Sequence, residues 1–219
     1  MADRYGLEVT NDDDVVSIDS EFNRLCIFHH GRYDGSGTQA SVAFQHPVKT
    51  VEPPLFFVRP DSNVNGISLG VIYGGEPGNW TSCAIASENP HGQVVVAAFD
   101  SQPISDYGLR LWSADEKLIF DSGAPTMNFT RLFQRWTYTH SVKGPTGAYT
   151  NWYYVPLDYQ FGDYFMVNNL RMLAMANNQT GRVVQMQFDF ASNALRIGLT
   201  AFQNPYAFTA CAVFGKPVA

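Results

Sequence analysis

The stretch "YGLRLWSADEKLIFDS", Tyr107–Ser122, repeats an earlier one, "YGLEVTNDDDVVSIDS", at Tyr5–Ser20. The two stretches align without a gap, 102 positions apart, and share six of sixteen residues. In each, apolar and polar residues alternate over two short runs on either side of an acidic corner, which is the pattern of a β-hairpin. Asp and Asn suit such corners because their side chains bond nearby backbone groups. The repeat therefore predicts the same hairpin at two places in the chain.

The shared residues are not chemically reactive, which favours a structural role for the hairpin. Tyr5, Gly6, Leu7, Asp13, Asp19 and Ser20 recur as Tyr107, Gly108, Leu109, Asp115, Asp121 and Ser122. Each Gly would let backbone approach closely where the strand begins. Each Asp-Ser pair would bond the loose backbone groups where the returning strand ends.

Further strand-like runs follow along the whole chain, separated by clusters of Gly, Pro, Asn and Asp. Their spacing predicts an all-β protein, an antiparallel β-sandwich or jelly-roll-like fold that contains the duplicated hairpin. The stretch 168–178, "NNLRMLAMANN", permits either a strand or about two turns of helix. The runs are residues 24–29, 40–45, 55–60, 67–74, 81–87, 93–100, 131–140, 164–169, 182–190, 194–202 and 207–215.

The distance between the two hairpins suggests two halves. Residues 1–102 would form one sandwich half with the first hairpin, and residues 103–219 a second half with the other. Outside the hairpins the halves do not align, so one continuous two-sheet domain explains the repeat equally well.

Composition limits the classes of partner. Of 219 residues, 45% are hydrophobic and 16% charged, and the net charge is −6. A packed core is expected, and nucleic acid is not an expected partner because no basic stripe faces a polyanion. No apolar run is long enough to span a bilayer and no secretion signal is apparent, so we expect no membrane insertion. Three widely spaced cysteines, Cys26, Cys83 and Cys211, predict buried thiols in a reducing cytoplasm rather than disulfides or a metal site.

Three segments resemble tail-tip and tail-fibre-associated proteins of long-tailed bacteriophages. They are the first hairpin, "PPLFFVRP" at Pro53–Pro60, and "AAFDSQPISDYGLRLWSADEKLIFDS", which ends at Ser122. In those proteins, hairpins of the form Tyr-Gly-Leu-x-Val-x-Asn-x-x-Gly-x-x-x-Phe-Asp-Ser are common. This chain departs from the form at its turn, where Asp14 and Glu116 replace Gly, and at Ile18, where Phe is typical. Residues from 123 onward take no part in the resemblance.

The resemblance implies a component of the virion at the tail end, made in the host cytoplasm. It would be a structural piece of the tail tip, baseplate or fibre, and it would contribute to assembly and to host attachment. Its partners would be copies of itself, with threefold symmetry expected from the class, other tail or baseplate proteins, and a host cell-surface receptor.

One segment, residues 144–165, has the composition of a recognition loop. It combines Tyr149, Trp152, Tyr153, Tyr154 and Tyr159 with Gly, Thr, Asn and Pro. Tyr and Trp offer large amphipathic contact areas with few torsions to freeze. The alternative is that these rings fill the core or a subunit interface. Trp80, in "YGGEPGNW", is a second contact candidate.

The sequence gives little support for a catalytic function. The chain has no Gly-x-Ser-x-Gly elbow. Asp158 and Asp163 are the nearest pair of carboxylates for glycoside hydrolysis, although they more readily shape a loop. We therefore predict no catalytic, cofactor-binding or metal-binding residues and no enzyme. A carbohydrate-binding module and a polysaccharide-cleaving enzyme remain the alternative functions.

Overall fold

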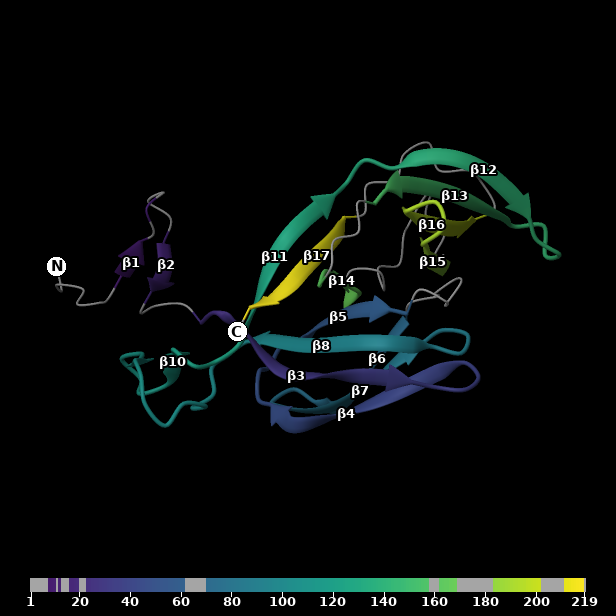
Figure 1. The fold of residues 1–219 in the computed structure, drawn as a ribbon. Coiled ribbons are helices and arrows are strands. Elements are labelled where there is room, and N and C mark those ends of the chain that lie inside the picture. The colour runs from purple at the N-terminus through teal and green to yellow at the C-terminus, as the bar shows by residue number, and fades with distance from the viewer. Residues whose placement is uncertain are drawn as a thin grey trace.

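Residues 8–10, 12, 16–19, 23–61, 70–157, 162–168, 183–201 and 211–218 are described by a computed structural model (Figure 1). The regular elements within these ranges are antiparallel β-strands. The prediction of an all-β fold is confirmed. Residues 169–178, which the sequence left open between strand and helix, lie outside the described residues.

Six strands form a closed barrel in the order β11-β17-β14-β5-β8-β3. It closes where Thr126 of β11 pairs with Cys26 of β3. Residues on both sides of position 102 supply its strands, so the two predicted halves share this sheet. The strands are β3 (Leu25–Asp34), β5 (Leu55–Pro60), β8 (His91–Phe99), β11 (Thr126–Phe133), β14 (Tyr164–Met166) and β17 (Ala212–Val218).

The barrel interior holds a small apolar cluster. The rings of Phe57 and Phe129 lie 6.1 Å apart, although β14 and β17 separate their strands in the sheet order. The sheet therefore curves toward the face that carries Phe57. The buried members of this interior cluster are Leu25, Phe57, Val95, Ala97, Met127 and Tyr164.

Two further sheets pack on the opposite, outer face of the barrel. One has the order β4-β7-β6 and the other β12-β13-β16-β15. Phe56 of the barrel contacts Tyr73 in the first sheet, and Phe165 contacts Phe188 in the second. These face-to-face layers agree with the predicted sandwich. The strands are β4 (Gln39–Val48), β6 (Gly70–Glu76), β7 (Asn79–Ala86), β12 (Thr137–Lys143), β13 (Tyr149–Pro156), β15 (Val183–Asp189) and β16 (Ala194–Ala201).

Both predicted hairpins form, each as a separate two-stranded sheet. The first joins β1 (Glu8–Thr10) to β2 (Val16–Asp19), and the second joins β9 (Arg110–Trp112) to β10 (Leu118–Asp121). Their registers are identical residue by residue, and the irregularity in the pairing falls at the same place in both. The repeated spelling therefore encodes the same backbone pairing twice.

No disulfide joins the three cysteines, all of which lie within the described residues. Cys26 and Cys83 are buried, as predicted, whereas Cys211 is partly exposed. Burial raises the pKa of Cys83 to about 12, so this thiol stays protonated at neutral pH.

The turn of the second hairpin holds a non-Gly residue in a left-handed conformation. Glu116, at the position where the tail-protein hairpins that it resembles carry Gly, has a φ of +60°. Its N–H donates to the carbonyl of Ser113, and the N–H of Ser113 donates to the carbonyl of Lys117. A Cβ makes this left-handed conformation unfavourable, whereas Gly adopts it freely.

We therefore expect Glu116→Gly to stabilise the protein by about 1 kcal/mol, because Gly removes the cost of a left-handed non-Gly residue. The free energy of unfolding in urea, compared with the parent, measures this change. Asp115→Gly is the matched control, one position earlier in the same turn, and it should lower stability instead. Equal effects from the two substitutions would contradict this account of the turn.

Candidate interaction surfaces

The aromatic segment predicted as a loop is largely a strand, β13, because its residues pair with β12 on one side and β16 on the other. The strand divides the aromatic side chains between two faces of its sheet. Asn151, Tyr153 and Val155 are buried, whereas Trp152 and Tyr154 between them are partly exposed. The pattern follows from the two-residue period of a strand, which sends neighbouring side chains to opposite faces. In the middle of β13 the described residues Trp152 and Tyr154 are the more accessible ones, and we call the face of the sheet that carries them the outer face.

The predicted residues on the inner side of β13 belong to the packing alternative. Tyr153 is 4% exposed and meets Tyr138 edge-on, with ring centroids 5.7 Å apart. Burial raises the pKa of Tyr153, and the neighbouring Tyr138 raises it further. Tyr149 belongs to the same side of β13 as Tyr153, but it lies at the end of the strand and is partly exposed, with the ammonium group of Lys143 over its ring.

The two remaining residues predicted to contact a partner are Trp80 and Tyr159. Trp80 is buried in the β4-β7-β6 sheet, and its indole N–H donates to the carbonyl of Thr50 across 2.9 Å. Its ring also meets Tyr73. Trp80 is therefore a core residue of that sheet. Tyr159 lies outside the described residues.

On the outer face, Trp152 is the middle of a cross-strand row. Its neighbours in register are His140 on β12 and Gly198 on β16. A Cβ built on Gly198 would lie only 2.9 Å from Cη2 and 3.0 Å from Cζ3 of Trp152. The six-membered edge of the indole thus lies directly over Gly198, in space that any side chain would occupy.

Hydroxyl groups beside the indole are already held in place. Thr139 donates to the carbonyl oxygen of Trp152 across 3.0 Å, and its Oγ1 lies 3.0 Å from Nδ1 of His140. In the next row, the hydroxyls of Thr150 and Thr200 lie 3.0 Å apart. These contacts fix polar groups on both sides of the ring.

The guanidinium of Arg196, on the same face, is already paired. Arg196 is the register neighbour of Tyr154, and its guanidinium lies 2.6 Å from the carboxylate of Asp189. Hydrogen bonds from Ser192 lower the pKa of Asp189 most strongly, and Arg196 adds to the effect. The pair is therefore charged on both sides at neutral pH, with little net charge of its own.

Of the two carboxylates considered for glycoside hydrolysis, the structure describes only Asp163. Asp163 is buried, forms an ion pair with Arg131 and accepts a hydrogen bond from Thr130. A carboxylate held in this way supports β11 from the neighbouring loop. Asp158 lies outside the described residues.

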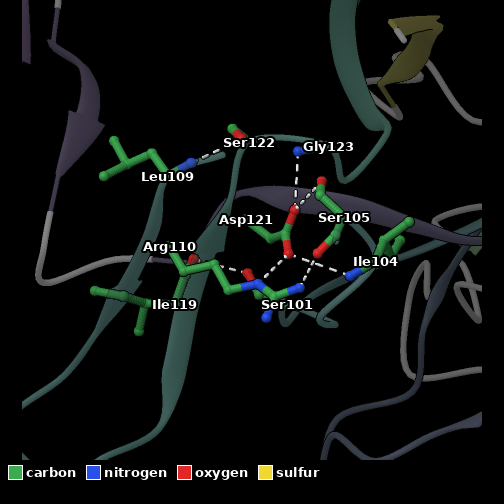
Figure 2. Close-up of polar contacts among 9 residues, drawn as sticks. All are labelled: Ser101, Ile104, Ser105, Leu109, Arg110, Ile119, Asp121, Ser122 and Gly123. Atoms are coloured by element: carbon green, nitrogen blue, oxygen red, sulfur yellow. Dashed lines mark hydrogen bonds and ion pairs between the residues drawn. The ribbon is translucent and has the colours of Figure 1, made fainter. Parts of the chain in front are cut away.

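The open end of the second hairpin explains why Gly and Ser recur together. The N–H of Leu109 donates to Oγ of Ser122, and the N–H of Ser122 donates back to the carbonyl of Leu109 (Figure 2). Gly108, with φ +131°, passes so close that a Cβ would lie 2.3 Å from the same Oγ. Gly in the first strand and Ser in the second are thus parts of one closure.

Asp121 anchors this hairpin to the preceding loop (Figure 2). Its side chain is fully buried, and it accepts hydrogen bonds from Arg110, the hydroxyl of Ser105, and the N–H groups of Ile104 and Gly123. Burial alone would raise the pKa of this carboxyl, but the four hydrogen bonds together hold it well below its usual range. The hairpin is therefore locked by a buried carboxylate.

Beyond the anchor, the second hairpin exposes large apolar side chains. Tyr107, the first residue of the repeated spelling, is 91% exposed, and Leu109 and Trp112 are about half-exposed. Contiguous exposed apolar residues commonly mark contacts with other proteins. The hairpin is a second candidate contact surface that the sequence alone did not single out.

Among the described residues, no group of three or more His, Cys, Asp or Glu side chains could hold a metal ion. The same residues contain no apolar helix of membrane-spanning length. Compared with known proteins, the chain matches no family model, no curated protein and no solved structure.

Replacing Asp121 by Asn should destabilise the protein by roughly 2–4 kcal/mol at pH 7, because Arg110 loses its buried partner. The pH dependence follows from the lowered pKa. The carboxylate stabilises the fold above the pKa of an unfolded Asp, about 3.9, and this contribution is lost as the pH falls toward the folded value. Urea unfolding at pH 7 and pH 3 should therefore show a smaller difference between parent and variant at pH 3.

The matched control is Asp106→Asn, an exposed carboxylate in the same loop. It should change stability by less than about 0.5 kcal/mol at either pH. An Asp121→Asn difference that does not shrink in acid would mean that the charge of this side chain is not what anchors the hairpin.

Proposed function

We propose that the chain is a structural component of a bacteriophage tail tip, baseplate or fibre, which contributes to tail assembly and to host attachment. After synthesis in the host cytoplasm it is built into the tail end of the virion as a homo-oligomer. Other tail proteins and a host cell-surface receptor are its further partners.

The observation that carries this proposal is the hairpin that the chain shares in spelling with tail-tip and tail-fibre-associated proteins. The hairpin occurs twice with one register. The close approach of Gly108 to Ser122 gives a physical reason why Gly and Ser stand at these positions. "LFFVRP" of the second resembling segment is β5, a barrel strand. The third segment contains the second hairpin together with the loop that anchors it. Each resembling segment therefore includes a defined structural element.

The exposed side of the second hairpin supports an assembly role. Tyr107, Leu109 and Trp112 offer apolar area to a neighbour, and the anchored backbone beneath them holds that area in one position. Such preorganised aromatic residues contribute strongly to protein interfaces. Strand β12, at the edge of its sheet, offers unpaired backbone to a further strand.

Purified protein should behave as an oligomer in size-exclusion chromatography with light scattering, and it should bind tail proteins from disrupted phage particles. Tyr107→Ala combined with Trp112→Ala should weaken these associations at least tenfold, because each truncated anchor costs more than about 1 kcal/mol. Val51→Ala, also at an exposed apolar residue, is the control and should leave association unchanged.

The proposal is abandoned if the protein remains a strict monomer at micromolar concentration and binds neither tail proteins nor host cells. Unchanged association in the double variant would keep the tail role but would move the contact away from the second hairpin.

A further inference from the structure

We infer that the outer face of β12, β13 and β16 is a binding platform for a neutral glycan, with the indole of Trp152 as the surface against which a sugar ring stacks. The platform consists of Trp152, Tyr154, His140, Gly198 and the Thr150–Thr200 pair. The inference names the ligand class of the proposed host contact, and to that extent it rests on the proposed function.

The orientation of the indole carries the inference. Strand side chains ordinarily stand roughly perpendicular to their sheet. Trp152 instead reclines across β16, with Cη2 and Cζ3 above Gly198. The indole is thus seated in one position against Gly198, and the side chain remains partly exposed. An indole held in place on a sheet offers apolar area against which the C–H face of a pyranose ring can pack.

The groups around the indole suit the hydroxyls of a sugar. His140 is oriented by Thr139 on one side, and the Thr150–Thr200 pair lies one row away. These groups are fixed before any ligand arrives, which lowers the entropic cost of binding. Adjacent strands lie about 4.8 Å apart, so successive sugar residues of a chain laid across the sheet would meet successive strands.

Charge and composition favour a neutral glycan over other ligands. The cation on the platform, Arg196, is neutralised by Asp189, and the whole chain carries a net charge of −6, which disfavours polyanions. A protein interface would have an apolar centre depleted of polar groups. Here Trp152 and Tyr154 are instead separated and surrounded by hydroxyl, imidazole and guanidinium groups.

The test uses the whole protein labelled with 5-fluorotryptophan and titrated with cellohexaose, maltohexaose and chitohexaose, with a heparin hexasaccharide as the charged comparison. Trp152→Phe identifies which fluorine resonance belongs to Trp152. That resonance should shift saturably with at least one neutral hexasaccharide and less with heparin. Trp152→Ala should weaken binding at least tenfold by calorimetry.

Gly198→Ala is the sharper variant, since it retains the indole. The added methyl group would occupy the space beneath Cη2 and should lift the ring, shifting the Trp152 resonance and weakening binding about fivefold. Tyr149→Ala, on the same strand but with the opposite parity, should bind like the parent. Urea unfolding of each variant separates lost binding from lost folding.

The inference is overturned if no neutral hexasaccharide moves the Trp152 resonance at millimolar concentration, or if Gly198→Ala and Trp152→Ala bind like the parent. Preferred binding of heparin would overturn the neutral class. The proposed function fails separately: glycan binding by a protein that associates with neither tail proteins nor host cells would leave the platform standing. Host-cell binding that survives both Trp152→Ala and periodate oxidation of the cell surface would retain the tail role and reject the platform.

Discussion

A line of aromatic contacts on the outer face of the barrel holds the three large sheets together. Phe56 meets Phe44 and Tyr73, and thereby fastens the β4-β7-β6 sheet. Phe165 and Phe214 meet each other, and Phe165 continues to Phe188 on β15. Phe44 and Tyr73 are partly buried and the other four rings are fully buried, so any shift of one sheet against the barrel would expose large apolar area. The arrangement of the sheets follows from this shared aromatic core.

The same core sets the positions of the two candidate surfaces. Strand β11 begins directly after the second hairpin, near the start of β3, and its far end leads into β12. Its eight residues extend over about 26 Å. Phe133, near that far end, packs edge-on against Phe214. One barrel strand thus links the hairpin surface to the sheet that carries Trp152, as Figure 1 illustrates.

The sequence predicted what depends on local pattern and missed what depends on pairing between distant strands. Alternation identified most of the strands but not β13, whose segment was expected to be a loop, and the repeat identified two hairpins with one register. The run 131–140 was read as one strand, but it is divided between β11 and β12, because its two ends pair with different sheets. The barrel closes through a pairing between residues 26 and 126, and no local sequence pattern predicts a pairing over that distance.

The same distinction applies to the candidate site. The two-residue period of a strand places Trp152 and Tyr153 on opposite faces, but it does not say which face is covered. The buried Ile197 and Leu199 of the paired strand identify the covered face. The role of Gly198 is likewise invisible until β13 is placed beside β16, since 46 positions separate it from the indole that it accommodates. Composition drew attention to the aromatic segment, yet could not say which rings are available.

The two copies of the hairpin differ at one informative position. Arg110, which pairs with the buried Asp121, corresponds to Glu8, and the register places Glu8 opposite Asp19. Like charges at directly opposite positions weaken a two-stranded sheet, whereas Arg and Asp strengthen it. What the described residues of both copies share is therefore the backbone register, while the Arg110–Asp121 pair of the second hairpin corresponds to two acidic residues in the first. Strand pairing and anchoring are thus separable in this hairpin, because the register is the same with either combination of residues at the position of the buried carboxylate.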